Sequence, residues 1–344
     1  MENYVAIDNV CAWPALSIHP GGAVFATIFN QPSHGRWEGD VECWASIDGG
    51  RLWCRRGIVA EHEPSTARVN HAAGVGPDGS LLALVSGFAG KPTYQEYCRD
   101  PSARPEISLL PLLNCRSTDE GHTWQTEETV VEAELGRNAI PFGKITTDQT
   151  GALCACAYTY PVDASSQLLF LRSRDNGRTW QGSPMAGANY NETDLLWMGD
   201  DRWLAVSRTK RERHLEVLRS TDDGHTWLNH GSVTLPQQHP GNLCRLSDGR
   251  VLMTYGLRNH GHWGVGARTS SDAGETWSAP SVLAHFPEAK DGGYPSSVQM
   301  PDGSIVTAYY ADGIPGHRRY HMGVVIWSLP EFGFAKGEDL KPRS

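Results

Sequence analysis

One eight-residue pattern recurs along this chain of 344 residues and limits its fold more than any other feature. The pattern is S-x-D-x-G-x-x-W, and its five copies are SIDGGRLW (46–53), STDEGHTW (117–124), SRDNGRTW (173–180), STDDGHTW (220–227) and SSDAGETW (270–277). Asp and Gly suit a tight turn, because the carboxylate accepts backbone N–H groups and glycine adopts a left-handed conformation. The Trp is expected to pack between neighbouring units. Five copies of this box predict a repeat protein.

A second, weaker repeat consists of a small-residue turn followed by an alternating apolar strand. Its six copies start near residues 19, 76, 148, 199, 246 and 300. Alternation with a period of two is typical of a strand with one buried face. The units are about 50 to about 70 residues apart, which fits the four-stranded blade of a propeller. We therefore predict an all-β fold, a six-bladed β-propeller in which residues 1–344 form a single domain with five boxes.

The last unit lacks a box and ends in the strand-like run YHMGVVIW (320–327). We expect an early strand around Tyr4 to Ile7 to complete the last sheet, because that closure removes free strand edges.

Composition and motifs exclude several classes of function. Lys and Arg number 30 against 39 Asp and Glu, and the net charge of −9 disfavours nucleic acid as a partner. No apolar run is long enough for a membrane helix, so no membrane partner is expected. The N-terminus MENYVAIDNV lacks the pattern of a secretory signal, which predicts a cytoplasmic protein unless a leader has been removed. No CxxC, P-loop or HExxH motif occurs, and we expect no metal and no other cofactor.

The boxes match the Asp-boxes of the sialidase (neuraminidase) superfamily, and the chain resembles a six-bladed sialidase-like propeller from end to end. In that family the boxes are structural and lie on the blade periphery, so they indicate fold and not chemistry. The resemblance implies a site with a Tyr nucleophile, a Glu that takes its proton, an acid/base Asp and three Arg that hold the substrate carboxylate. A phenol is a weak nucleophile and needs an adjacent base.

The resemblance assigns four of these roles to residues of this chain. Tyr294, in DGGYPSS, matches the nucleophile just before the inner strand of the sixth blade. Glu192, in NETDLL, matches the base before the fourth inner strand, and Arg208 follows at that strand's end. Arg258, in GLRNHG, matches a second arginine of the clamp. Glu192 and Arg208 are one hairpin apart, so both side chains can face the central funnel.

The first blade departs from the family pattern. Ala12 stands where the first clamp arginine is expected, in the run Ala12-Trp13-Pro14. A bidentate Arg–carboxylate contact is a large share of anion recognition, so its loss leaves a uronic acid or another ulosonic acid open beside sialic acid. Arg36 or Arg68 is expected to compensate.

The acid/base group is expected in the polar loop NQPSHGRWEGDVE (30–42). Asp40 is the predicted acid/base, with Glu38 as its nearest competitor. His34 is a candidate proton donor or hydroxyl contact, and His71 is a candidate sugar contact.

Three functions follow as hypotheses, each with a glycan as partner. The leading one is a sialidase-like exo-glycoside hydrolase that acts with retention on a terminal acidic sugar. The second is a propeller lyase on uronic-acid glycans, in which a Tyr or His among His34, His71 and Tyr294 abstracts a proton. The third is a carbohydrate-binding propeller without catalysis. The oligomeric state does not follow from the sequence.

Overall fold

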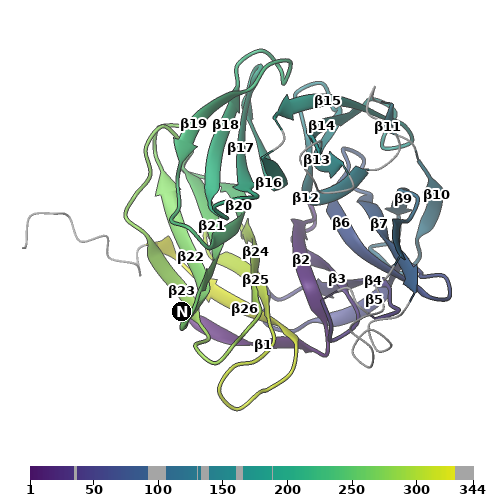
Figure 1. Ribbon diagram of the computed structural model, residues 1–344, viewed down its shortest axis with the longest axis vertical. Helices are drawn as coiled ribbons and strands as arrows, with labels where there is room; N and C mark the ends of the chain where they lie inside the picture. The colour runs from purple at the N-terminus through teal and green to yellow at the C-terminus, as the bar shows by residue number, and fades with distance from the viewer. Residues whose placement is uncertain are drawn as a thin grey trace, which may run out of the picture.

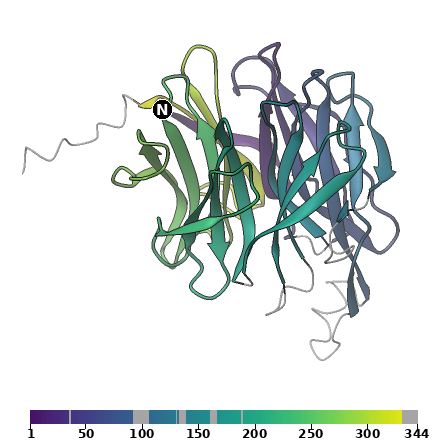
Figure 2. The same ribbon diagram turned by 90° about the horizontal axis from the view of Figure 1, so that it is seen from above.

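The computed structural model describes residues 1–34, 37–91, 106–129, 131–132, 139–159, 166–187 and 189–329. These residues form 26 β-strands and no α-helix, so the all-β prediction is confirmed. The sheets are arranged in a ring around a central axis (Figure 1), and the view from above shows them side by side around that axis (Figure 2). Within the same ranges, no helix is long and apolar enough to cross a membrane.

The first three groups of strands follow one another along the chain. The first contains β2 (Cys11–Ile18), β3 (Val24–Phe29), β4 (Val41–Ser46) and β5 (Cys54–Ala60). The second contains β6 (Thr66–Val75), β7 (Leu81–Lys91), β9 (Leu113–Ser117) and β10 (Gln125–Glu128), with β8 (Glu106–Leu109) paired to β7. The third contains β12 (Ala139–Thr147), β13 (Leu153–Thr159), β14 (Leu168–Ser173) and β15 (Trp180–Ala186), with β11 (Val131–Glu132) paired to β15.

The other three groups repeat this arrangement. The fourth contains β16 (Tyr190–Gly199), β17 (Arg202–Thr209), β18 (Leu215–Ser220) and β19 (Leu228–Ser232). The fifth contains β20 (Gln238–Arg245), β21 (Val251–Asn259), β22 (His262–Ser270) and β23 (Ser281–His285). The sixth contains β24 (Gly292–Gln299), β25 (Ile305–Ala311), β26 (His321–Trp327) and β1 (Glu2–Asp8). A short parallel pairing of β6 with β12 joins the second and third groups into one sheet, and the whole pattern is consistent with six four-stranded blades.

The innermost strands are β2, β6, β12, β16, β20 and β24, which contact one another around the ring (Figure 1). The alternating strands singled out in the sequence are therefore the second strands of the groups, and the expectation that they are the inner ones is wrong. The inner strands are less regular in sequence because they line the axis and face neighbours on both sides. Glu192 and Tyr294 consequently lie within inner strands, not ahead of them.

The ring closes as the sequence predicts. Strand β1 pairs antiparallel with β26, with Tyr4 opposite Val324, so the N-terminal strand completes the last sheet. Pairing the two ends of the chain in one sheet covers the outer edge of β26.

The five boxes form one kind of turn, which joins the third strand to the fourth in each of the first five groups. In the fourth box, Ser220 Oγ donates to Asp222 at 2.7 Å, and Gly224 N donates to Ser220 Oγ at 2.8 Å. Thr226 donates to the Asp222 carboxylate from its backbone and its hydroxyl, and Trp227 Nε1 donates to Gly224 O at 3.1 Å. Gly224 has a φ of +82°, so the left-handed glycine turn is confirmed.

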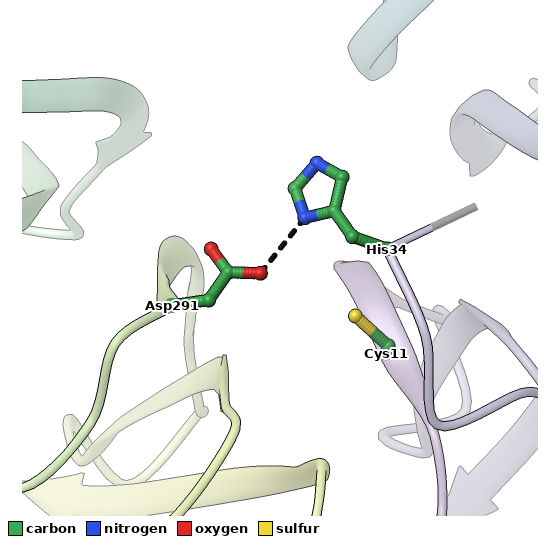
Figure 3. Close-up of side chains that lie close together, drawn as sticks. All are labelled: Cys11, His34 and Asp291. Carbon is green, nitrogen blue, oxygen red and sulfur yellow. Dashed lines mark hydrogen bonds and ion pairs between the residues drawn. The ribbon is translucent and has the colours of Figure 1, made fainter. Parts of the chain in front are cut away.

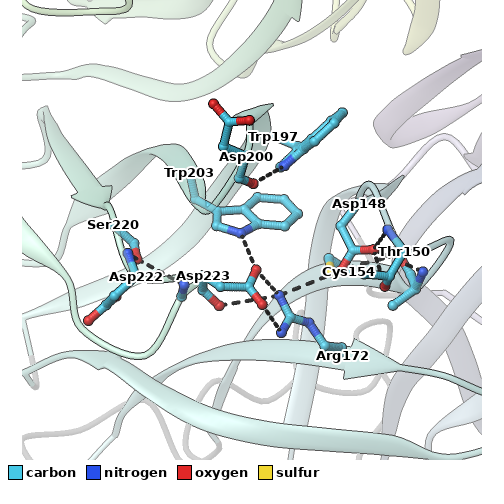
Figure 4. A network of polar contacts seen from close by, with 12 residues as sticks. Asp148, Thr150, Cys154, Arg172, Trp197, Asp200, Trp203, Ser220, Asp222 and Asp223 are labelled. Carbon is cyan, nitrogen blue, oxygen red and sulfur yellow. Dashed lines mark hydrogen bonds and ion pairs between the residues drawn. The ribbon is translucent and has the colours of Figure 1, made fainter.

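Polar contacts link the fourth box to the neighbouring sheet (Figure 4). Arg172, on β14, donates to both carboxylate oxygens of Asp223 at 2.7 and 2.6 Å, and lies 3.6 Å from Asp148. Trp203 Nε1, on β17, donates to the same Asp223 carboxylate at 3.2 Å. Phe170 and Trp203 pack edge to face beside this contact, at 5.2 Å between ring centroids. Apolar packing and a bidentate ion pair therefore join the third and fourth sheets.

Candidate active site

All six inner strands are irregular near the end where they begin. Relative to its partner strand, each inner strand contains one or two extra residues there, for example between Tyr190 and Thr193 in β16 and between Gly293 and Ser296 in β24. Such β-bulges redirect side chains and are common beside active sites. Glu192 and Tyr294 lie in two of these bulges, so the same local feature turns both toward one place.

The backbone at Tyr294 is unusual. Tyr294 has a φ of +53°, which non-glycine residues rarely adopt, and it follows Gly293 with a φ of +95°. A Cβ atom at Gly293 would lie 3.0 Å from the Gly256 Cα, so the two strands approach too closely there for side chains. The DGGY segment thus permits a close approach of β24 to β21 and a strained conformation that aims the tyrosine. Strain of this kind is often found at functional sites.

Tyr294, Glu192 and Arg208 form one buried cluster. Tyr294 Oη donates to Glu192 Oε1 at 2.7 Å, and Arg208 Nη1 lies 2.5 Å from Glu192 Oε2 and 3.3 Å from Tyr294 Oη. Burial, and then the charge of Glu192, raise the pKa of Tyr294 well above its usual range, although Arg208 and Arg258 oppose this shift. The phenol is therefore neutral, and its proton points at a carboxylate that can accept it.

Aromatic rings and a second arginine surround the phenol ring. Trp13 stacks on Tyr294 with 4.9 Å between ring centroids and 20° between planes, and Phe142 packs edge-on at 6.1 Å. The Arg258 guanidinium lies 5.4 Å from the Tyr294 ring centroid and 4.9 Å from that of Trp263. These contacts hold the ring in place and bring a positive charge to its face.

Asp291 organises the side of the cluster next to Arg258. Arg258 Nη2 donates to Asp291 Oδ1 at 2.9 Å, and His34 Nδ1 lies 2.9 Å from Asp291 Oδ2. The hydroxyls of Tyr310 and Tyr320 each donate to the same carboxylate at 3.0 Å. Burial favours the protonated acid, but the contacts with His34, Arg258 and Tyr310 outweigh it and hold the pKa of Asp291 well below its usual range.

Three residues of the cluster, Asp291, Tyr310 and Tyr320, were not among the predicted site residues. Asp291 stands three residues before Tyr294 in the same DGGY run, and that proximity was a usable signal. The two tyrosines gave no local signal, because Tyr310 lies in the apolar alternation of β25 and Tyr320 stands in the loop before β26.

The structure brings Tyr294, Glu192, Arg208, Arg258 and His34 together, but two other predicted residues have partners elsewhere. Arg68 donates to Glu63 and to the Pro111 carbonyl, each at 2.7 Å. Asp40 lies 2.6 Å from His62 Nδ1 and also accepts the His62 backbone N–H at 2.8 Å. No hydrogen bond among the described residues joins Arg68 or Asp40 to the Tyr294 cluster.

The remaining predicted residues are placed as follows. Glu38 is partly exposed and lies 3.8 Å from His62 Nε2. Arg36 lies outside the described residues. His71 is buried within β6, where its two ring nitrogens lie 3.1 and 3.2 Å from the Val69 and Thr27 carbonyls. Burial lowers the pKa of His71. His71 nevertheless lines a small cavity of about 20 Å³, one wall of which is Tyr294.

Position 12, on the first inner strand β2, supplies no charge to the site. Ala12 is fully buried with a φ of +33°, and Trp13 beside it supplies the ring that stacks on Tyr294. His239 is also buried, and its ring nitrogens have no hydrogen-bond partner among the described residues. Burial and the charges of Arg208 and Arg258 lower the pKa of His239 to about 2, so this imidazole is neutral.

One cluster has the spacing of a metal site. The Cys11 thiol, a His34 ring nitrogen and an Asp291 oxygen all lie within 4.8 Å of one another (Figure 3). A metal would require the Cys11 thiolate, but burial raises the pKa of this thiol well above its usual range. Arg258 already neutralises Asp291. The cluster therefore fits a divalent cation poorly.

Comparisons with known proteins agree with this architecture. Residues 22–307 match the model of the BNR repeat-like domain. The chain is 22% identical over 334 residues to a sialidase of Micromonospora viridifaciens, covering 86% of this chain and 49% of that protein. The chain thus spans about half the length of this curated relative.

Two solved structures share the fold. A protein of unknown function from Dyadobacter fermentans has a TM-score of 0.78 and 23% identity, with 95% of this chain and 97% of that chain covered. The Hadza microbial sialidase Hz136 has a TM-score of 0.73 and 17% identity, with 96% of this chain and 69% of that chain covered. The match over residues 22–307 shows that the chain belongs to the BNR repeat-like family, and the similarity to a sialidase agrees with the superfamily that the boxes indicate.

Proposed function

We propose that this protein is an exo-glycoside hydrolase that releases a terminal acidic sugar, a sialic acid or a related ulosonic or uronic acid, with retention of configuration. The observation that carries the proposal is the buried hydrogen bond of 2.7 Å from Tyr294 Oη to Glu192 Oε1. It supplies a nucleophile that is neutral at rest together with the base that activates it.

In the first step, Tyr294 Oη forms a bond to the anomeric carbon while the glycosidic C–O bond breaks. The phenol proton passes to Glu192, and a general acid protonates the departing oxygen. In the second step, water attacks the same carbon and gives a proton to the general acid, which lost its own in the first step, while the tyrosine leaves and takes its proton back from Glu192. Two displacements at one carbon give net retention. A neutral phenol suits a substrate whose carboxylate repels a charged nucleophile.

Arg208 and Arg258 are the cations proposed to hold the substrate carboxylate. Both guanidinium groups lie beside Tyr294, Arg208 through its 3.3 Å contact and Arg258 over the ring face. A planar guanidinium is suited to a carboxylate because it presents paired N–H groups.

The proposal is tested by product analysis. The protein is incubated with 4-methylumbelliferyl glycosides of sialic, ulosonic and uronic acids and with matching oligosaccharides, and products are followed by mass spectrometry and proton NMR. We expect a free acidic sugar, first formed as the retained anomer. Tyr294→Phe is expected to remove this activity, by roughly 10⁴-fold or more.

Tyr190→Phe is the matched control, because Tyr190 also donates to a glutamate, Glu216, which lies on β18, the third strand of the same sheet. An inverted first product, or full activity in Tyr294→Phe, would contradict the mechanism. A product short by one water that absorbs in the ultraviolet would instead establish the lyase. Binding without any product would leave a carbohydrate-binding propeller.

A further inference from the structure

We propose that His34, oriented by Asp291, is the general acid/base of this site. This inference rests on the proposed hydrolase and names the group that protonates the departing oxygen. The carboxylate expected in this loop, Asp40, is not that group.

The hydrogen bonds of Asp291 fix which nitrogen of His34 is available. His34 Nδ1 lies 2.9 Å from Asp291 Oδ2. An ionised carboxylate only accepts hydrogen bonds, so this contact requires that Nδ1 carry a proton. Nε2 is then the nitrogen that gains and loses a proton, and it points away from Asp291 (Figure 3). A carboxylate that fixes the tautomer and orientation of a catalytic histidine is a recurrent arrangement in enzymes.

His34 lies where the leaving group has to depart. Its ring centroid is 6.4 Å from that of Tyr294 and 5.3 Å from that of Trp13. The His34 side chain is 35% exposed, whereas Tyr294 is 4% exposed. The imidazole is thus more exposed than the nucleophile and, in this proposal, close enough to reach a glycosidic oxygen on the substrate that Tyr294 attacks.

Asp40 is occupied by other partners. Its carboxylate lies 2.6 Å from His62 Nδ1, accepts the His62 N–H at 2.8 Å and accepts Asn30 Nδ2 at 3.0 Å. These bonds hold the Asp40 carboxylate against His62 and Asn30. A general acid needs instead to be protonated and free to reach the departing oxygen.

The charges of the cluster leave room for one more cation when an anionic substrate binds. Arg208 is paired with Glu192 and Arg258 with Asp291, so two cations are balanced by two carboxylates. Ala12 contributes no charge. A substrate carboxylate therefore meets a site with no net charge unless His34 is protonated. A protonated His34 supplies both the missing positive charge and the proton for the leaving group.

The groups that face His34 come from four parts of the chain. Asp291 precedes β24, and Tyr310, on β25, has its hydroxyl 3.1 Å from His34 Nδ1. The Cys11 thiol, on β2, lies within 4.8 Å of a His34 ring nitrogen. The Tyr294 ring, on β24, packs edge-on to the His34 ring at 6.4 Å between centroids. Only Asp291 is charged among these four groups, so its carboxylate is the main electrostatic influence on the imidazole.

The proton balance closes over the two steps. His34 Nε2–H passes its proton to the glycosidic oxygen as the C–O bond breaks. In the second step Nε2 takes a proton from the attacking water, and the site returns to its starting state. Asp291 stays ionised throughout and acts as a positioning residue.

The test compares His34→Ala and His34→Gln with Asp40→Asn, and uses His230→Ala, an exposed residue of β19, as the matched histidine control. Each variant is assayed on the best 4-methylumbelliferyl glycoside of the panel and on the oligosaccharide with the same terminal sugar. We expect both His34 variants to lose about 10²- to 10⁴-fold in kcat/KM on the oligosaccharide, whose leaving group needs a proton. The loss on the aryl glycoside is expected to be much smaller, because its leaving group departs without protonation.

Two further readouts separate catalysis from folding. Azide is expected to restore turnover of the aryl glycoside by the His34 variants and to give a glycosyl azide of retained configuration, since azide needs no base. Asp291→Asn is expected to lower kcat more than it raises KM, and to change the ¹⁵N shifts that report the His34 tautomer.

Opposite results overturn the inference. If Asp40→Asn shows the leaving-group dependence and azide rescue while His34→Ala behaves like His230→Ala, then Asp40 is the acid/base and the hydrolase still stands. If the unaltered protein turns over no glycoside, the proposed function fails, and this inference fails with it.

Discussion

The box turns and the Tyr294 cluster lie at opposite ends of the strands and are built in opposite ways. In the fourth box, Ser220 and Asp222 are bonded across 2 positions of the sequence. In the cluster, Tyr294 and Glu192 are 102 positions apart, and His34 and Asp291 are 257 apart. The boxes repeat one local solution five times, whereas the cluster occurs once and depends on the closure of the whole ring.

This difference implies that changes in the two regions have separable effects. A box residue acts on the stability of its own turn and its contact with the next sheet. A cluster residue acts on chemistry, because its partners are held in place by strands that do not depend on it.

Glu192→Gln is expected to lower kcat/KM by about 10²- to 10⁴-fold, because an amide cannot take the phenol proton. It is also expected to lower the free energy of unfolding, since Arg208 loses the charge that balances it. Steady-state kinetics and thermal unfolding measure the two effects.

Glu216→Gln is the control for this variant. Glu216 also accepts a hydrogen bond from a tyrosine, Tyr190, and from His214, but away from the cluster. We expect unchanged kcat/KM per folded molecule. A comparable loss of activity in Glu216→Gln would show that the chemistry does not reside in the Tyr294 cluster.

Gly224→Ala in the fourth box is expected to cost about 2–4 kcal/mol of unfolding free energy, from left-handed strain and overpacking together. The added Cβ would lie 2.7 Å from the Phe170 ring, which is held against Trp203. Gly249→Ala is the matched variant, because Gly249 has a φ of +88° with nothing within 4 Å.

Gly249→Ala is expected to cost only the strain, about 1–2 kcal/mol. Denaturant unfolding measures the difference between the two variants. Equal destabilisation would show that the contact between the box and the neighbouring sheet adds nothing to the turn itself.

Removing the Arg172–Asp223 contact is expected to lower the free energy of unfolding less than Gly224→Ala does. A double-mutant cycle with Arg172→Met and Asp223→Asn should give a coupling of about 1 kcal/mol, because the Asp223 side chain is 34% exposed and solvent screens the pair. Unfolding by urea measures the cycle. A coupling near zero would leave apolar packing alone between the third and fourth sheets.

The smallest expected effect is a change in how the free energy of unfolding depends on pH in acid. Hydrogen bonds from Thr226 and Ser220 lower the pKa of Asp222 to about 2, and Asp119 and Asp272 are lowered to about 2 in the same way. A carboxyl with a lowered pKa stabilises the fold above its unfolded pKa, about 3.9, and loses this contribution as the pH falls through 2.

The triple variant with Asn at Asp119, Asp222 and Asp272 is therefore expected to show a weaker decline of stability between about pH 4 and pH 2. Thermal unfolding across this range measures it, with Asp201→Asn as an exposed control. An unchanged slope would show that other carboxyl groups govern the acid sensitivity.

Much of the fold could be predicted because its signals are local. The boxes and the period-two alternation of β3, β7, β13, β17, β21 and β25 are short patterns that hydrogen bonding and one-sided burial impose. The identity of the inner strands could not be predicted in this way. They are bulged and face neighbours on two sides, so their sequences lack a simple period.

The residues of the site also fall into those that local sequence could indicate and those that it could not. Tyr294, Glu192, Arg208 and Arg258 could be named from short motifs, and the structure brings these four side chains together. Asp40 and Arg68 looked equally suitable in sequence, but each has another partner, His62 for Asp40 and Glu63 for Arg68. Asp291 was overlooked because its role depends on Arg258 and His34, which reach it from other sheets.

The turns, the alternating strands and the residue types available at the site follow from interactions between near neighbours, so short stretches of sequence are enough to predict them. Only the tertiary structure decided which polar side chains meet. That choice depends on closing a ring in which β1 pairs with β26, and on bulges that set the direction of each inner strand. Contacts across hundreds of positions form only after the sheets are packed, so no local pattern could specify the pairing of His34 with Asp291.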